Sequence, residues 1–555
     1  MSLEIGISKL NSFQKNIFEE CIKKGSGGLS IPLGSGKTLI SLVLGLQLTQ
    51  TSNPILVIVS KTLVESWVFE INKFFGDTLK YAVLHNAYSN VDKFALTDDI
   101  KLILTTPEVT SKFYKDENIS EKFVKKEIIN EAQFNQHVIN TYNRVREPLS
   151  ENRIGGSLLF STNWGCLIVD EIQKYTKIST LRCQSMASIC SNHKWVLSGT
   201  MFSEPSTERI LGYHLIIDHP SFPRSLPWAE KYIKSRLFRG FNSTIVKRDT
   251  NPAFKEPKIN QIIVSHELSY EEAKIYMSMK KTMGMINEKV KLYKELNDTA
   301  NLRKFSSYLL ALICYLRQCI ICPILPIANV AIDMTDFQNK SKLSSILSSE
   351  IDKLGLKSWL SNVESVKSSR FKKAIETIDT HPHENLIVFT CFRTCLDVFR
   401  EYLPTNRKIY TLSSTMSSKK RAQILEAYNI PTETGMGHIL LLTYEIGCEG
   451  LNLQVSNTVL LLDFYWNDAQ TQQAIGRVLR YGQMAETVNI YMFTSNTAIE
   501  SAMFEKHDLK LMIINELSTG TAKTKLKTMK VEDIINLIQK EENIKALNKL
   551  HNKTV

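Results

Sequence analysis

The stretch "GGLSIPLGSGKTLISLVLG", residues 27–45, contains the strongest structural signal in the chain. A short apolar run leads into a glycine-rich turn, and the turn leads into an apolar segment long enough for a helix. The usual phosphate-binding loop has its first glycine at a position that Ile31 occupies here. The stretch is therefore either a nucleotide-binding loop or a turn that contains Gly-Lys-Thr by chance.

The strand before the turn and the helix after it favour the nucleotide-binding loop. Glycines at 34 and 36 let backbone N–H groups approach a phosphate, and the N-terminus of a helix favours an anion. Lys37 would reach the β- and γ-phosphates, and Thr38 would hold Mg²⁺. The candidate nucleotide contacts in the loop are Leu33, Gly34, Ser35, Gly36, Lys37 and Thr38.

Composition predicts an intracellular protein of several domains. A chain of 555 residues is too long for one hydrophobic core, and ten cysteines form no dense framework, which suggests a reducing compartment. The sequence contains no run of about 18 apolar residues, so no membrane span is predicted, and its first residues lack the apolar core of a signal peptide. The net charge of +12 suits a polyanionic partner such as nucleic acid.

Two sets of short apolar runs without alternation predict two parallel sheets covered by helices on both faces. The first set is 54–60, 100–106, 165–171 and 194–200, and the second is 384–390, 438–445, 457–464 and 486–493. The fold class is therefore α/β with two lobes. Residues 265–350 are expected to be helical, and the polar segment 112–160 is expected to be an insertion in the first lobe.

An acidic pair supplies the second half of the predicted nucleotide site. Asp170 ends a buried strand and would hold Mg²⁺, and Glu171 would orient or deprotonate the attacking water. A solvated Asp-Glu pair at a strand end is the alternative, and the order of the two motifs argues against it. The Ser-Gly-Thr at 198–200 could couple this site to another surface.

The order of these motifs resembles the motor of superfamily-two helicases, and further segments resemble its Swi/Snf-like branch. The loop of that branch has its first glycine at the position of Gly34, so Ile31 is no departure from it. The chain departs from the pattern of that branch at two places. Ile31-Pro32 replaces an acidic pair, and Gln173 replaces a histidine. The supporting first-lobe segments are "LNSFQ" (10–14), "ILVIVSKTLVESWVFEINKFF" (55–75, with Trp67) and "LTTPEV" (104–109).

The middle of the chain and the second lobe resemble the same branch. Cys322 stands where the family's L-R-Q-x-C-x-H-P element has histidine. Cys314, Cys319 and Cys322 could be read as metal ligands, but their spacing matches no common zinc pattern, so buried thiols are predicted. The matching segments are 245–249, 255–258, 309–325, 385–392, 412–428, 439–463 and 463–483.

The resemblance implies two RecA-like parallel-sheet lobes with helical insertions between them and a C-terminal helical tail. ATP and Mg²⁺ would bind in the cleft between the lobes, with Gln14 on the adenine. Arg477 and Arg480 would share one face of a helix and reach the γ-phosphate, with Gln473 one turn earlier. The expected divisions are 1–225 for the first lobe, 226–365 for the helical and linker region, 366–515 for the second lobe and 516–555 for the tail.

The resemblance also implies a motor that moves on duplex DNA without separating its strands. Alternatives are a strand-separating DNA or RNA helicase and a regulator that binds nucleic acid but hydrolyses ATP weakly. Transcription or repair proteins are further candidate partners, a monomer is expected, and the location would be the nucleus or a cytoplasmic viral factory. Candidate DNA contacts are Ser60, Lys61, Thr105, Thr106, Arg393, Ser413 and Asn452.

Overall fold

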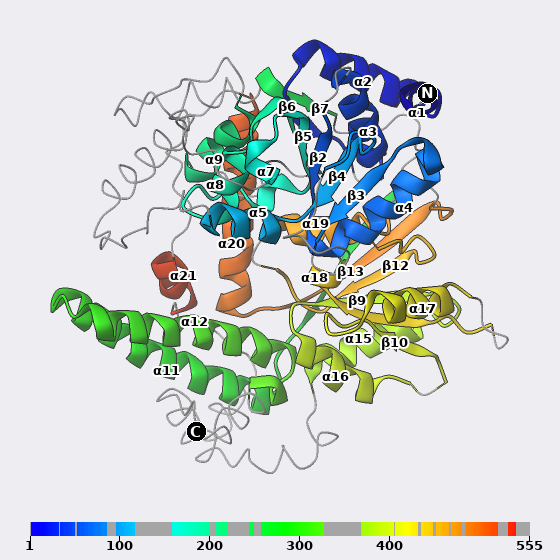
Figure 1. The fold of residues 1–555 in the computed structure, drawn as a ribbon. Coiled ribbons are helices and arrows are strands. Elements are labelled where there is room, and N and C mark those ends of the chain that lie inside the picture. Colours follow the sequence, from blue (N-terminus) through cyan, green and yellow to red (C-terminus); the bar gives the residue numbers. More distant parts are fainter. Residues whose placement is uncertain are drawn as a thin grey trace, which may run out of the picture. The chain divides into compact units, whose positions relative to one another are not determined.

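The computed structural model divides the chain into two compact units (Figure 1). The first unit is Met1–Glu256 with Lys510–Thr528, and the second is Pro257–Leu509 with Met529–Val555. The four-part division expected from the sequence stays a prediction. The structure describes residues 2–32, 34–49, 53–85, 96–116, 158–199, 201, 207–218, 243–248, 257–326, 368–404, 406–430, 435–447, 451–465, 468–479, 483–519 and 531–539.

The first unit is built on a sheet of seven strands in the order β3-β4-β2-β5-β6-β1-β7. Every pairing in this sheet is parallel, as predicted. β2 and β4 consist entirely of buried β-branched and aliphatic residues, as expected for strands that helices cover on both faces. The strands are β1 (Gly27–Ser30), β2 (Ile55–Ile58), β3 (Tyr81–Leu84), β4 (Leu102–Thr105), β5 (Trp164–Val169), β6 (Ser191–Ser198) and β7 (Ile245–Lys247).

Local sequence explains where the helices of this unit begin. Asn11 and Gln14 form a reciprocal capping box at the start of α2. Residues 39–45 of α3 are all buried, so this helix is enclosed by the core. The helices are α1 (Ser2–Ser8), α2 (Ser12–Lys24), α3 (Lys37–Leu48), α4 (Val64–Phe75), α5 (Pro107–Asp116), α7 (Leu158–Ser161), α8 (Leu181–Ala187) and α9 (Thr207–Ile217), with 3-10 turns η1 (Lys61–Leu63), η2 (Gly76–Thr78) and η5 (Ile172–Lys174).

The second unit is built on a sheet of six strands in the order β10-β11-β9-β12-β13-β8. Its pairings are also all parallel, which confirms the second predicted sheet. β3 and β10 are only four and three residues long, too short to give a recognisable sequence pattern. The strands are β8 (Lys258–His266), β9 (Leu386–Thr390), β10 (Ile409–Thr411), β11 (Ile439–Thr443), β12 (Thr458–Leu461) and β13 (Thr487–Ser495).

Two long helices, α11 (Tyr270–Glu295) and α12 (Thr299–Ile321), form the predicted helical segment and pack side by side (Figure 1). Together with α21 (Val531–Ile538) they enclose a separate hydrophobic cluster. The predicted insertion 112–160 and tail lie largely outside the described residues. The other helices are α15 (Ser369–Asp379), α16 (Arg393–Tyr402), α17 (Ser418–Asn429), α18 (Tyr444–Gly447), α19 (Asp468–Ile475) and α20 (Ala498–Thr519).

By length and composition alone, α12 could cross a membrane, which the sequence analysis did not anticipate. More than half of its apolar window is buried inside the protein, at 56%. Leu309, Leu312 and Leu316 belong to the cluster shared with α11. A buried core helix passes the same test, so this helix is weak evidence for a membrane span.

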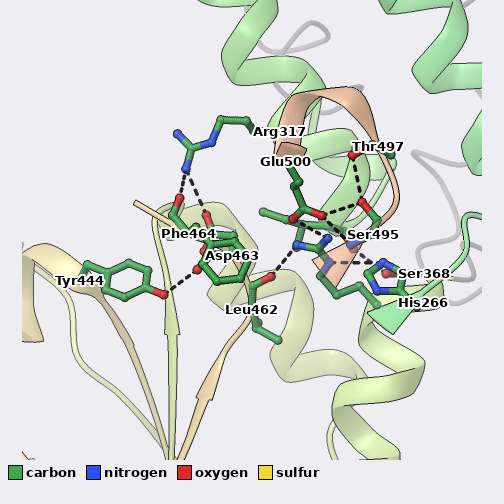
Figure 2. A network of polar contacts seen from close by, with 12 residues as sticks. His266, Arg317, Ser368, Tyr444, Leu462, Asp463, Phe464, Ser495, Thr497 and Glu500 are labelled. Carbon is green, nitrogen blue, oxygen red and sulfur yellow. Dashed lines mark hydrogen bonds and ion pairs between the residues drawn. The ribbon is translucent and has the colours of Figure 1, made fainter. Parts of the chain in front are cut away.

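A buried ion pair joins three elements of the second unit (Figure 2). The guanidinium of Arg370 in α15 lies 2.8 Å from Oε1 of Glu500 in α20, and the two side chains are 0% and 2% exposed. Arg370 also donates from Nε to Nε2 of His266, at the end of β8, at 3.4 Å. Burial, and next the charge of Arg370, lowers the pKa of His266 to about 3. The imidazole is therefore neutral in the folded protein at neutral pH.

We expect His266 to make the second unit sensitive to acid. The unfolded chain binds a proton near pH 6.5 and the folded one near 3, so stability falls as the pH drops between these values, by about 1.4 kcal/mol per unit once the unfolded His is fully protonated. The charges of Arg370 and Lys373 act on His266, and Glu500 is the ion-pair partner of Arg370. Urea unfolding at pH 7 and pH 5 should show a smaller acid-induced loss for His266→Gln than for the wild type.

The exposed His383 provides the matched control, because His383→Gln changes a histidine that the fold does not bury. That variant should keep the wild-type pH dependence. An identical loss of stability in His266→Gln and the wild type would contradict the prediction.

Candidate nucleotide site and arginine segment

The predicted nucleotide residues lie at the carboxyl ends of three neighbouring strands. β5, β6 and β1 are adjacent in the first sheet, and they lead to Asp170, Ser198 and the glycine-rich loop respectively. The carboxyl ends of parallel strands meet at one edge of the sheet, where open α/β sheets bind their ligands. The fold therefore brings together residues that lie far apart in the sequence.

The loop places two glycines where only glycine is readily accommodated. Gly34 and Gly36 have φ angles of 78° and 83°, in the left-handed region. α3 begins at Lys37, directly after the second glycine, so its first N–H groups are available to an anion. The Lys37 ammonium donates to the carbonyl oxygens of Ile31 and Pro32 at 3.1 and 3.4 Å. The N–H of Ser35 also bonds to Pro32, at 3.3 Å.

Gln14 supports this loop from α2. Its amide Nε2 donates to the carbonyl of Ser35 at 3.0 Å, while its oxygen accepts from the N–H of Asn11. A Cβ at Gly36 would lie 2.3 Å from Nε2 of Gln14, so this side chain also requires the glycine. Gln14 thus braces the loop, and the contact with adenine that the resemblance implies stays a prediction.

Asp170 is a buried carboxylate held at both oxygens. Oδ1 accepts the N–H of Glu171 at 2.9 Å, and Oδ2 accepts the indole N–H of Trp67 at 3.0 Å. Burial, and next the charge of Glu171, raises the pKa of Asp170 to about 6, while Trp67 and Lys37 act in the opposite direction. An oxygen ligand beside the hydroxyl-bearing start of α3 suits a hard cation such as Mg²⁺.

A chain of polar contacts connects Glu171 with the end of β6. Glu171 has a φ of 49°, which is unusual for a residue with a side chain and is typical of functional sites. The amide of Gln173 donates to the Glu171 carboxylate, and Ser198 Oγ donates to Gln173 Oε1 at 2.7 Å. Ser198 is thus connected to Glu171 through Gln173. The coupling of residues 198–200 to another surface stays a prediction.

The arginine segment of the second unit differs from the prediction in one respect. Gln473 lies in α19, but that helix ends at Ile475, so Arg477 lies in the turn that follows and not within the helix. The N–H of Arg477 bonds to Ala474 at 3.1 Å, three residues back, which tightens the last turn. Gln473 and Arg477 are both buried, and Arg480 and Leu33 lie outside the described residues.

Three side chains from different elements hold the strand end that leads into α19 (Figure 2). They donate to three successive carbonyl oxygens, at residues 462, 463 and 464. The donors are Arg370 at 2.8 Å, the Tyr444 hydroxyl at 2.5 Å and Arg317 at 2.6 Å.

Asp463, in the middle of this strand end, accepts the N–H of Cys391 at 2.9 Å and lies 3.5 Å from Arg317. Burial raises its pKa, which the charge of Arg317 opposes. A buried carboxylate with two partners fixes the start of the arginine segment.

The predicted DNA contacts divide into exposed and buried residues. Lys61, Arg393 and Asn452 are exposed, and Ser60 is partly exposed. Ser413 is 8% exposed, and its Oγ lies 2.9 Å from that of Thr415. Thr105 and Thr106 are fully buried, and Thr105 donates its hydroxyl to Leu84 in β3. Their hydroxyls are therefore not at the surface of this structure, which corrects the expectation of a direct DNA contact.

Sequence reasoning missed several residues that shape these sites. No sequence pattern indicates Arg370 or Glu500, and Trp67 is indicated only by the family resemblance. Of the three cysteines that were weighed as ligands, Cys319 and Cys322 are buried as predicted, but Cys314 is exposed. A buried charge with a distant partner leaves no local periodic signal. Arg317 is different, because an arginine within an apolar helix indicates a buried, paired charge.

Comparison with family models identifies the class of protein. A model described as "SNF2-related domain" matches residues 20–324, and one described as "Helicase conserved C-terminal domain" matches residues 369–482. The first match covers more than half of the chain. The chain belongs to the SNF2-related family of superfamily-two helicases and is an ATP-hydrolysing enzyme with two α/β lobes.

Individual proteins show the same relationship. The chain is 26% identical over 540 residues to "Putative helicase 172L" of invertebrate iridescent virus 6, covering 88% of this chain and 84% of that protein. It is 29% identical over 182 residues to the DNA repair and recombination protein RAD54 of Saccharomyces cerevisiae, covering 32% of this chain and 20% of RAD54.

DNA repair protein RAD5 of Kluyveromyces lactis is 29% identical over 188 residues, covering 33% of this chain and 16% of RAD5. A solved Sulfolobus solfataricus SWI2/SNF2 ATPase core in complex with dsDNA matches 92% of this chain and 93% of its own, at 17% identity. Its TM-score of 0.35 is too low to support an argument.

We expect Gln173 and Ser198 to act as one unit on Glu171. Gln173→Ala should lower kcat for ATP hydrolysis about tenfold, or ~1.4 kcal/mol, with little change in KM, because it frees the Glu171 carboxylate, which is predicted to orient the attacking water. Ser198→Ala in the Gln173→Ala background should have little further effect. Steady-state kinetics of the double-mutant cycle measures this coupling, expected at about 0.5–3 kcal/mol.

Gln184→Ala serves as the matched control for Gln173→Ala. Gln184 is also a buried glutamine of the first unit, but its amide donates to the carbonyl of Ile178 at 2.9 Å. Its replacement should leave kcat close to the wild-type value. Fully additive effects of the Gln173 and Ser198 changes would contradict a shared action on Glu171.

Proposed function

We propose that this enzyme is a Swi/Snf-type motor that uses ATP hydrolysis to move along duplex DNA and remodel DNA-bound complexes. The observation that carries the proposal is the convergence of a phosphate loop, a buried Asp170 and a braced Glu171 at one sheet edge. The family match over residues 20–324 and the similarity to DNA repair proteins support the choice of DNA. The net charge of +12 suits a polyanionic track.

The donor set fits ATP with Mg²⁺. The N–H groups at the start of α3 and the ammonium of Lys37 would bind the phosphates, and the Thr38 hydroxyl and the Asp170 carboxylate are hard oxygen ligands suited to Mg²⁺. A bound Mg²⁺ neutralises charge on the β- and γ-phosphates. Glu171, held by Gln173, would orient the attacking water and receive its proton.

The second unit would contribute arginine side chains to the reaction. Arg477, and Arg480 by resemblance, would stabilise negative charge on the transferring phosphoryl group. Gln473 would accompany them from α19. Because Arg317 and Arg370 hold the strand end before α19, these groups start from a fixed position.

DNA would be tracked through its backbone and not through its bases. Lys61 and Ser60 in the first unit follow β2, and Arg393, Ser413 and Asn452 in the second unit follow strands or their short connecting helices. These positions share the carboxyl ends of their sheets with the nucleotide residues. Phosphate contacts of this kind suit movement on any sequence.

The motor function is tested by comparing ATP turnover with movement on DNA. Wild-type enzyme should show ATPase activity stimulated by duplex DNA and should displace the third strand of a triplex without unwinding a fork. Lys37→Ala should lose both activities by about a hundredfold or more, because the phosphates lose a charged donor. Lys174→Ala, near the same sheet edge but outside the loop, is the control.

Each other outcome points to a different function. Fork unwinding by the wild type would indicate a strand-separating helicase. Stimulation by RNA alone would indicate an RNA substrate. DNA binding without stimulated turnover would indicate a regulator that keeps the fold, and would refute the motor.

A further inference from the structure

The indole of Trp67 contacts the nucleotide site but has no part in the proposed chemistry. Trp67 lies near the start of α4 and is 3% exposed. Its Nε1 donates to Oδ2 of Asp170 at 3.0 Å, across 103 positions of sequence. The backbone N–H of Glu171 donates to the other oxygen, so the Asp170 carboxylate cannot rotate without breaking a buried hydrogen bond.

The strand pairing of the first sheet fixes this contact. β2 and β5 are neighbours in register, with Ile58 opposite Val169, and the N–H of Asp170 bonds to the carbonyl of Ile58 at 3.0 Å. β2 leads through η1 into α4, and β5 leads directly to Asp170. The indole and the carboxylate therefore come from two adjacent strand ends.

Tryptophan suits this position for an electrostatic reason. A lysine or arginine here would also hold the carboxylate, but its charge would repel a cation at the same oxygens. The indole N–H is a donor without net charge, and it needs a partner because it is buried. Trp67 packs in the hydrophobic cluster with Val64 and Ile71, so its ring orientation is set by packing.

We propose that Trp67 is a positioning residue that orients the Asp170 carboxylate to bind a divalent cation together with the nucleotide. The inference rests on the proposed function, which assigns Asp170 to the metal. Carboxylate ligands of metals are generally held by such outer hydrogen bonds. Loss of one typically costs about 10- to 100-fold in metal affinity or activity.

The test measures metal affinity directly, with Mn²⁺ as a paramagnetic probe in the presence of ADP. Trp67→Phe removes the N–H but keeps a buried aromatic ring. Its Mn²⁺ affinity, measured by EPR of the free ion, should fall about tenfold or more. The Mg²⁺ concentration for half-maximal ATPase activity should rise in parallel, while KM for ATP at saturating Mg²⁺ changes little.

Trp164→Phe is the matched control. Trp164 begins β5, the strand that ends beside Asp170, and is fully buried, and its indole donates to the carbonyl of Leu159 at 3.0 Å. Both variants lose one buried indole hydrogen bond in the same unit. Only Trp67→Phe should change the metal affinity, and both should keep a cooperative unfolding transition.

The outcomes separate this inference from the proposed function. Unchanged Mn²⁺ affinity in Trp67→Phe, or an equal loss in Trp164→Phe, overturns the positioning role. A wild type that binds Mn²⁺ and ADP but does not move on DNA refutes the motor, and the role of Trp67 is still decided by its variant. A wild type that binds no Mn²⁺ with ADP refutes both.

Discussion

The hydrogen-bonded carboxylate of Asp170 is the constraint on which the first unit's site depends. A carboxylate buried at the end of β5 is costly unless each oxygen has a donor. The fold supplies them from Glu171 and Trp67. Meeting this requirement fixes the neighbours as well, because Glu171 takes a left-handed backbone conformation and its side chain is then held by Gln173. The geometry of the site is thus largely set by the need to solvate one buried charge with protein groups.

The second unit also buries charged groups that need partners, but there the buried charges include positive ones. Here the buried charges that need partners include two guanidinium groups, those of Arg317 and Arg370. Each is paired with a carboxylate and also donates to the backbone that leads into α19. Breaking such a buried pair by removing one partner typically costs about 3–5 kcal/mol. The position of the arginine segment therefore depends on the ion pairs of Arg317 and Arg370, which join several elements of the unit.

Much of this could be predicted from sequence because parallel sheets order their strand ends. Once the apolar runs were recognised as buried strands, Asp170, Ser198 and the glycine-rich loop had to share one edge. The same reasoning could not show that Thr105 is buried beside β3, since a strand of four residues gives too weak a pattern. Nor could it pair Trp67 with Asp170 or Arg370 with Glu500, because contacts across more than a hundred positions have no periodic signature.

The geometry of the loop between β1 and α3 also explains why Ile31 can stand where the usual phosphate-binding loop has glycine. Positive φ angles, among the described loop residues, occur at Gly34 and Gly36, whereas Ile31 is 1% exposed and belongs to the core. A glycine there would forfeit the burial of an isoleucine side chain, about 1.5–3 kcal/mol. Pro32 has no N–H to donate just beyond the end of β1, but its carbonyl oxygen accepts hydrogen bonds from the N–H of Ser35 and the ammonium of Lys37. A triphosphate would offer Lys37 charged acceptors, which form stronger hydrogen bonds than these carbonyl oxygens. The same lysine can therefore stabilise the loop by itself and still favour the nucleotide.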